Sequence, residues 1–486
     1  MSASPGWRQG DLPHPPPFSL ANLARVLGPG GLLLGLSIGA ADWLLGPAVA
    51  LTHGPALLWL ATASILLQAL VNTEMARYTL ATGESIFAGF MRTWPGPRFW
   101  GWVYAVMLLG QVAWPGWALG AGSALATLLL GHAPRSDEWA LVRGLGYLVL
   151  AGSVTVVLLG RRVERHLVRG QLATTAWALA FLLVAAVALV PGAVWRRTAL
   201  GFLGPLAAPV PPPPAADWTL LAALAGYAGA GGLLNATFTQ WLRDKGFGMA
   251  GMVPPAPLTL GWQTLPLGDQ GLLVAPGEDN AAKLRRWWPY VRADLWGLFV
   301  AGSLLGMGLC VALALAAVPA GADLTGPGAG AALARGVTER HGLGWGVATL
   351  LTGFVILAMA QVGLTWGVVR SATDILVSAA RLTPGADPPA VGAIFHGTLG
   401  ALTVTAALTM TLGDALTLVV VSANLAAAAL ALASVHTLWV TWRVLPRPVR
   451  SPLWGRVALL VAAGFFGWLV LAALGTPVRG TPAAWW

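Results

Sequence analysis

Long apolar runs recur along almost the whole chain, and they constrain its fold more than any other feature. The runs extend from Leu27 to Ala473, and short polar stretches separate them. Each run is close to the roughly 20 residues that a helix needs to cross the hydrocarbon core of a bilayer. Lipid cannot satisfy free backbone N–H and C=O groups, so runs of this kind must be helical. With 9% charged residues, against roughly 25% in an average soluble domain, the composition argues against a soluble fold.

The pattern predicts an all-α integral membrane protein with about eleven transmembrane helices. We place these helices at 27–51, 55–78, 99–130, 139–160, 170–191, 218–242, 291–318, 343–376, 391–412, 413–442 and 454–475. The proline-rich segment 1–26 is predicted to be a disordered tail, without a cleavable signal peptide. The segment 243–290 is expected to be an inner loop. It ends in the basic and aromatic cluster Lys283–Trp288, which is predicted to form an interfacial cap on the seventh helix.

The net charge of +10 is a signal of topology rather than of nucleic-acid binding. With the N-terminus inside, 21 of the 28 Lys and Arg residues fall on the inner side, as the positive-inside rule demands. The seven on the outer side are Arg135, Arg143, Arg196, Arg197, Arg335, Arg340 and Arg479. We therefore expect a multi-pass protein with a cytoplasmic N-terminus and an outer C-terminus. The lipid bilayer is its expected partner, nucleic acid is not, and the oligomeric state stays open.

Two predicted spans carry helix-breaking residues at comparable positions. In the first, Asp42 lies among glycines, and in the sixth Asn235 follows a glycine-rich stretch. Interrupted segments at corresponding positions of two halves point to a binding site at the middle of the membrane. We therefore expect 27–191 and 218–442 to form inverted repeats of five helices each, with 454–475 as an added helix. The expected helix breaks are Gly39 and Ala41 in the first span and Gly231 and Gly232 in the sixth.

Asp42 is the strongest single candidate for a functional residue. A carboxylate at the middle of a span costs roughly 2.5–3.5 kcal/mol even on insertion-based scales, so it is rarely there without a role. Asn235 and Gln361 lie on helices expected to line the same cavity. Asn424 in the tenth helix is compatible with either a ligand or an interhelical hydrogen bond.

Three stretches of the chain resemble the natural resistance-associated macrophage protein (Nramp) family. They are Gly28-Pro29-Gly30 at the start of the first helix, the run from Asn72 to Ser85, and Gln361 six residues before Gly367. The resemblance implies a leucine-transporter-type inverted repeat and the proton-linked transport of divalent metals. The chain departs from the family where it matters most. Gly39, Ala40, Ala41 and Asp42 stand in place of an Asp-Pro-Gly-Asn motif, and Gly232 and Leu234 stand in place of methionine and histidine.

The remaining candidate ligands are oxygen atoms. They are the Asp42 carboxylate, the carbonyls near Gly39 and Gly231, and the amides of Asn235, Gln361 and Asn424. Oxygen ligands suit hard cations, so manganese or magnesium is the favoured substrate, with Asp42 and Asn235 as metal ligands and protons as a possible coupled ion. One carboxylate balances half the charge of a divalent ion. An organic cation or amine therefore stays open, as does a non-transporting scaffold or sensor.

Enzymatic function finds no support in the sequence. It contains no metalloprotease, phosphate-loop or nucleophile-elbow motif, and its single cysteine, Cys310, lies in an apolar run. No cofactor is expected. Near the inner ends of helices, Glu74, Arg77 and Glu84 are predicted to form an ion-pair network, and Arg370 to pair with Asp374 at i,i+4. His396 and His436 are candidate proton relays or packing residues.

Overall fold

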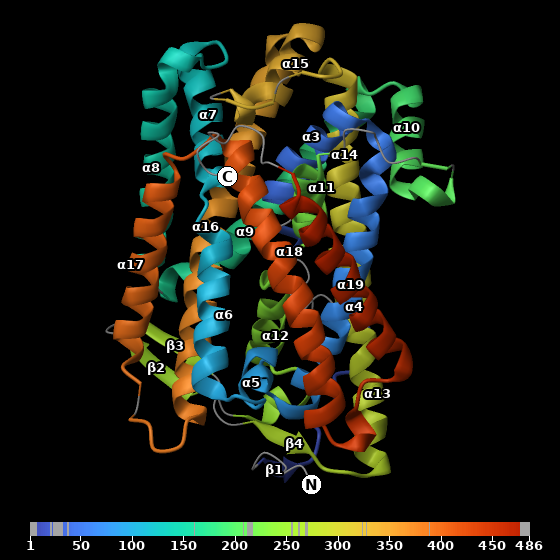
Figure 1. The fold of residues 1–486 in the computed structure, drawn as a ribbon, viewed down its shortest axis with the longest axis vertical. Coiled ribbons are helices and arrows are strands. Elements are labelled where there is room, and N and C mark those ends of the chain that lie inside the picture. The colour runs from blue at the N-terminus through green and yellow to red at the C-terminus, as the bar shows by residue number, and fades with distance from the viewer. Residues whose placement is uncertain are drawn as a thin grey trace.

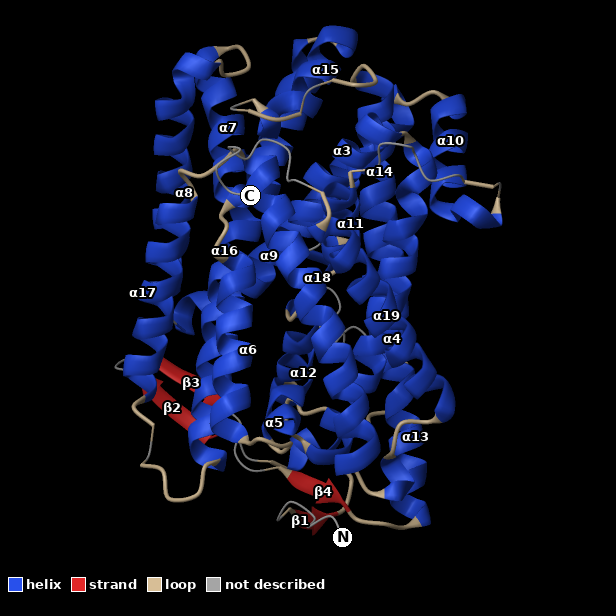
Figure 2. Cartoon of the chain, in the orientation of Figure 1, coloured by secondary structure: helices blue, strands red, loops and turns tan. Residues whose placement is uncertain are grey.

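Long helices run roughly along one common axis and form an elongated bundle in the computed structural model (Figure 1). The structure describes residues 7–19, 22, 33–35, 38–159, 161–207, 209–210, 217–253, 256–260, 263–267, 271–322, 324–326, 328–387 and 389–476. Strands occur in this part only as two short two-stranded sheets, both near the end of the bundle that holds the N-terminus (Figure 2). The chain is therefore an all-α membrane protein, as predicted.

The first half of the bundle contains one π-helical segment and eight α-helices in the described residues. They are η1 (Ile38–Leu45), α3 (Gly46–His53), α4 (Trp59–Thr82), α5 (Ile86–Met91), α6 (Pro97–Val112), α7 (Gly116–Leu130), α8 (Trp139–Leu158), α9 (Arg161–Leu189) and α10 (Gly192–Leu203). The predicted third helix is interrupted between α6 and α7 because Pro115 cannot continue the hydrogen-bond ladder of α6.

The second half has two π-helical segments among its helices. Its helical elements are α11 (Trp218–Tyr227), α12 (Leu234–Asp244), α13 (Glu278–Arg292), η6 (Ala293–Val300), α14 (Ala301–Ala317), α15 (Ala332–His341), α16 (Leu343–Leu382), α17 (Val391–Thr409), α18 (Ala415–Trp439), η8 (Val440–Val444) and α19 (Leu453–Leu474). The strands are β1 (Arg8–Gly10), β2 (Ala256–Leu260), β3 (Gln263–Leu267) and β4 (Leu272–Val274).

Nine helical stretches of the described part are long and apolar enough to cross a membrane. The interrupted pair α11–α12 and the first span, of which η1 and α3 are described, account for the other two predicted helices. The seventh helix differs from the prediction because it begins at Glu278. Its acidic first turn, Glu278 and Asp279, lies at the positive end of the helix dipole, and Lys283 pairs with Asp279 at 2.6 Å. The Lys283–Trp288 cluster is thus part of a continuous helix.

The N-terminal segment is ordered by tertiary contacts in residues 7–19. Strand β1 pairs in parallel with β4. The buried Leu12 donates its backbone N–H to Asn280 Oδ1 at 2.9 Å, and the Trp287 indole donates to the Pro13 carbonyl at 3.2 Å. The prediction of a disordered tail is therefore wrong for these residues. Proline-rich sequence forms no local hydrogen bonds of its own, and here α13 and β4 supply the partners.

Leu12→Asp should detach this segment from the bundle. Leu12 is 1% exposed, and its burial contributes about 1.5–3 kcal/mol, whereas a buried carboxylate would be strongly unfavourable. We expect faster loss of an N-terminal tag to trypsin acting after Arg8. His14→Asp places the same charge on an exposed neighbouring side chain and should leave the rate unchanged. Equal rates for the two variants would show that Leu12 does not anchor the segment.

Candidate functional site

The sixth span is interrupted between α11 and α12, where the chain leaves helical geometry at the predicted positions. Gly229, Gly231 and Gly232 have φ angles of 97°, 82° and 52°, which residues with a side chain rarely adopt. A Cβ at Gly231 would enter the ring of Tyr227, and one at Gly232 would meet Gln111 Oε1 and the backbone of Ala426. The glycines are therefore required both by the backbone angles and by the surrounding side chains.

Gln68 of α4 holds this interruption together. Its Oε1 accepts from the backbone N–H groups of Ala230 and Gly231, both at 3.2 Å, and its Nε2 donates to the Ala228 carbonyl. Nε2 also donates to Ser64 Oγ at 2.9 Å. One buried side chain thus satisfies backbone groups that lost their helical partners, which lipid cannot do.

Gln111 at the end of α6 supports the same interruption from another direction. Its Oε1 accepts from the Leu233 N–H at 3.1 Å, and its backbone carbonyl accepts from the hydroxyls of Ser422 and Tyr227. Helices α4 and α6 therefore hold the interruption from two sides. The sequence reasoning missed Gln68 and Gln111; their signal was a polar amide in the middle of an otherwise apolar run.

Asn235 belongs to this hydrogen-bond network. Its Nδ2 donates to Gln68 Oε1 at 2.8 Å and to the Gly232 carbonyl at 3.1 Å, and its Oδ1 accepts from Asn72 at 2.9 Å. In this arrangement the amide stabilises the break. Its assignment as a metal ligand would require these bonds to rearrange.

The first span keeps helical geometry through the position where unwinding was predicted. Gly39 and Ala41 lie within η1, a π-helix, so the predicted helix break there is wrong. A π-helix accommodates an irregularity by widening one turn instead of releasing the backbone, and such turns are frequent at functional sites. The absence of a side chain at Gly39 allows close packing, because a Cβ there would overlap the Cβ of Ala360 in α16 and lie 3.6 Å from Trp117 Cδ1.

Asp42 is completely buried in this π-helical segment. Its carboxylate lies against Gly306 of α14, where a Cβ would come within 2.5 Å of Oδ2. Asp42 and Asn235, the two predicted metal ligands, therefore face different helices, α14 and α4. In the described part of the chain no group of three or more His, Cys, Asp or Glu side chains is arranged to hold a metal ion.

The other two predicted ligands lie on α16 and α18. Gln361 is 3% exposed and donates to Thr365 Oγ1 at 3.2 Å, and it follows Ala360, which packs on Gly39. Asn424 donates to the carbonyls of Thr219 at 2.9 Å and Val420 at 2.8 Å. Gln361 is thus next to the first span. Asn424 instead forms a hydrogen bond that joins α18 to α11.

Charged side chains close the bundle at the end that holds the N-terminus. Asp374 of α16 accepts from Arg243 at 2.9 Å and from Gln240 at 2.7 Å, both on α12. Arg370 pairs with Asp244, so the predicted i,i+4 pair of Arg370 with Asp374 is wrong. Side chains on a neighbouring helix bring better geometry than those one turn away.

A second group of ion pairs lies near the same end. Arg77 pairs with Glu74 at 2.9 Å, which confirms that part of the predicted network. Glu84 pairs instead with Arg92 at 2.5 Å and accepts from the Trp7 indole at 3.2 Å. His436 packs among aromatic rings and bonds to Thr93 and Tyr104, both at 2.7 Å, and the exposed His396 bonds to the Gly392 carbonyl.

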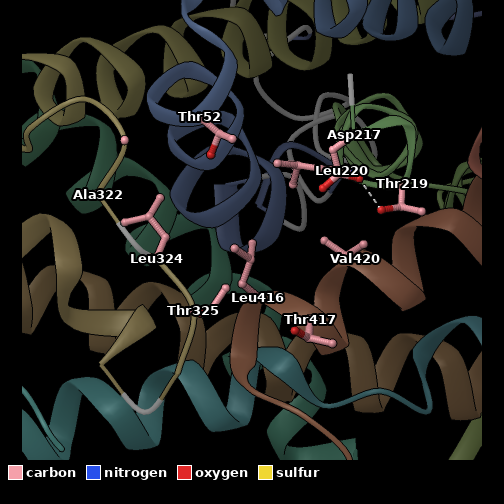
Figure 3. Close-up of a pocket in the computed structure, with 11 residues that line it drawn as sticks. Thr52, Asp217, Thr219, Leu220, Ala322, Leu324, Thr325, Leu416, Thr417 and Val420 are labelled. Carbon is pink, nitrogen blue, oxygen red and sulfur yellow. Dashed lines mark hydrogen bonds between the residues drawn. The ribbon is translucent and has the colours of Figure 1, made fainter. Parts of the chain in front are cut away.

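A cavity of about 360 Å³ lies beside the first turns of α11 and α18, away from the ion-paired end of the bundle (Figure 3). Its polar wall consists of Thr52, Asp217, Thr219, Thr325 and Thr417. Asp217 caps α11 and accepts from the Thr219 hydroxyl at 2.6 Å, the dashed line in Figure 3. The interruption between α11 and α12 therefore lies between the end of the bundle that holds the ion pairs and the end that holds the cavity.

Neither family models nor curated proteins match this sequence, whereas solved transporter structures match its fold. A manganese transporter of Eremococcus coleocola, mutant H236A, has a TM-score of 0.61 at 13% identity, over 96% of this chain and 89% of the other. The same transporter in complex with an aromatic bis-isothiourea substituted compound gives 0.63 at 14% identity, over 94% and 88%.

A second kind of transporter is also similar. Mhp1, a nucleobase-cation-symport-1 family transporter in a closed conformation with bromovinylhydantoin bound, has a TM-score of 0.52 at 14% identity, over 94% of both chains. The chain thus has the leucine-transporter-type fold that was predicted. Identities of this size establish the fold and leave the substrate open.

Proposed function

We propose that this protein is a secondary active transporter that moves a small cationic solute by alternating access. The observation that carries the proposal is the glycine-rich interruption of helix 6, clamped by Gln68 and Gln111 beside a π-helical turn of helix 1. Unwound backbone inside a membrane is typical of transporter binding sites. The ion-paired inner end and the cavity at the opposite end fit a conformation that is open to one side only.

A buried carboxylate supports a positively charged substrate. Asp42 lies in the π-helical turn with no exposed surface, and ionisable residues inside membrane spans mark substrate or ion pathways. Helix η1, in the proposed first repeat, also packs on α11, α14 and α16 of the proposed second repeat, so a movement of η1 would change contacts between the two repeats. A bound cation would neutralise Asp42 as the site closes.

A divalent metal, manganese or magnesium, is the first form of this proposal. It is supported by the fold of the manganese transporter and by the Nramp-like motifs, and protons are the proposed coupled ion. Membership of the Nramp family belongs to the same proposal. The described residues supply one carboxylate and neutral amide or carbonyl oxygens, so the ion would keep some of its water.

An organic cation is the second form. Trp117 and Tyr227 pack edge to face with ring centroids 5.6 Å apart, and Trp117 Cδ1 lies beside Gly39. Aromatic rings attract organic cations and pack on flat solutes, and Mhp1 has bound bromovinylhydantoin. A single carboxylate balances the charge of a monovalent amine.

Uptake into proteoliposomes tests the proposal. We expect accumulation of manganese, magnesium or an amine by the wild type and at least a tenfold loss for Asp42→Asn, because neutral asparagine cannot balance the cation. Asp279→Asn, at an exposed site on α13, is the matched control and should retain uptake. Failure of the wild type to accumulate any of these solutes, or any of the organic probes named in the next subsection, would favour a scaffold or sensor instead.

A further inference from the structure

Two buried N–H donors of the third span have no hydrogen-bond partner among the residues that the structure describes. Gln111 and Trp117 are each 1% exposed, and their Nε2 and Nε1 atoms are both without an acceptor. Leaving a buried donor unpaired is unfavourable, and most such groups in folded proteins are paired. Two unpaired donors beside one interruption therefore point to an acceptor that comes from outside the chain.

The hydrogen bonds of Gln111 fix which half of its amide is unpaired. Oε1 accepts from Leu233 N–H at 3.1 Å, and only the oxygen of the amide can accept that bond. The nitrogen is then the half without a partner. The oxygen half of the amide faces Gly232, where a Cβ would come within 2.4 Å of Oε1, so the nitrogen belongs to the same surroundings of the interruption.

The Trp117 ring lies between η1 and α11. Its ring packs edge-on against Tyr227, at the end of α11. Cδ1, which is bonded to Nε1, faces Gly39 of the first span. The pyrrole edge of the indole is therefore directed to the π-helical turn.

Gln361 contributes the opposite kind of group. Its Oε1 is buried and finds no hydrogen-bond partner in the described part of the chain, and the preceding residue, Ala360, packs against Gly39. From the interruption of the sixth span to the turn at Gly39, the described residues thus present two unpaired donors, on α6 and α7, and one unpaired acceptor, on α16.

We propose that the transported solute is a small organic molecule that joins a hydrogen-bond acceptor to a cationic or N–H group. Gln111 and Trp117 donate to its carbonyl, carboxylate or ring nitrogen, and Gln361 accepts from its N–H. A bare metal ion offers no acceptor, and the positive ends of two N–H dipoles repel it. This inference rests on the transporter function proposed above and narrows its substrate class.

Thermal protection followed by liposome uptake tests the substrate class. The probes are Mn²⁺ and methylammonium, which carry charge without an acceptor, and glycine and hydantoin, which carry both groups. We expect protection and uptake with glycine or hydantoin and neither with the first two. The reverse result, uptake of Mn²⁺ or methylammonium alone, would overturn the inference while leaving the transporter function intact. No binding or uptake of any probe would reject both.

Trp117→Phe isolates the indole donor because it keeps an aromatic ring. It should weaken the affinity for the accepted organic probe about five- to tenfold, the loss expected for one hydrogen bond. Gln111→Glu keeps the acceptor for Leu233 and removes the amide donor, and should also weaken binding.

Trp59→Phe is the matched control, since the Trp59 indole N–H is likewise buried and unpaired but lies at the start of α4, away from the interruption. Unchanged affinity in both Trp117→Phe and Gln111→Glu would mean that water satisfies these donors, and the inference would fall.

Discussion

Gln68→Leu should destabilise the protein by about 3–9 kcal/mol and abolish uptake. The substitution leaves the N–H groups of Ala230 and Gly231 and the Ala228 carbonyl buried without partners. Each unsatisfied group costs about 1–3 kcal/mol. Loss of Gln68 also frees the interruption between α11 and α12, whose position the proposed transport cycle requires. The measurement is the thermal unfolding transition in detergent, followed by uptake.

Gln171→Leu is the control for this prediction. Gln171 is also a buried glutamine, and its Nε2 donates to one backbone carbonyl, that of Gly35, at 3.2 Å. We expect a loss of about 1 kcal/mol for this variant. Equal destabilisation by the two substitutions would show that Gln68 is one buried amide among others rather than the residue that holds the break.

Asp374→Leu should open the end of the bundle that holds the N-terminus, which the proposed topology places inside, and reduce uptake by at least tenfold. The change removes the acceptor of Arg243 and Gln240, which joins α12 to α16. Breaking a buried ion pair from one side costs about 3–5 kcal/mol when the remaining charge is left alone. Arg243 keeps Asp244 as a partner at 3.2 Å, so we expect a smaller loss here. The substitution destabilises the conformation in which α12 and α16 are joined through Asp374. It does not destabilise a conformation in which these two helices are apart. The equilibrium therefore moves to the inward-open state.

Labelling of an introduced cysteine measures this shift. In a Cys310→Ala background, Thr237→Cys places a thiol on α12 at a buried position, and a membrane-impermeant maleimide applied from the inner side should label it faster when Asp374 is replaced. Asp279→Asn is the control. Asp279 is 72% exposed and pairs with Lys283, so its replacement should not change the labelling rate. Labelling that is equally slow in all variants would mean that these ion pairs do not close the inner end.

The candidate site was predictable only as far as its backbone. The glycines of helix 6 are readable because an interruption in an apolar span requires residues without side chains, and Gly231 and Gly232 lie where the chain leaves the helix. The partners of the interruption were not predictable. Gln68 and Gln111 belong to α4 and α6. The side-chain amide of Asn235, a predicted ligand, is hydrogen-bonded to Gln68 and Asn72.

Ion pairing shows the same division. Arg370 and Asp374 have the i,i+4 spacing that favours a pair on one helix. Each instead bonds to α12, Arg370 to Asp244 and Asp374 to Arg243. Spacing along one helix fixes which side chains are near each other, but packing against a second helix decides which partner is in better reach.

Hydropathy by itself determined that this chain is a bundle of membrane-spanning helices, because the satisfaction of backbone groups in lipid depends on each segment alone. The tertiary structure decided the rest of the site. The wider turn of η1 directs Asp42 to Gly306 of α14, and β4 and α13 order residues that have no structure of their own. Both outcomes depend on contacts between distant segments, and no local pattern of residues records which segments will meet.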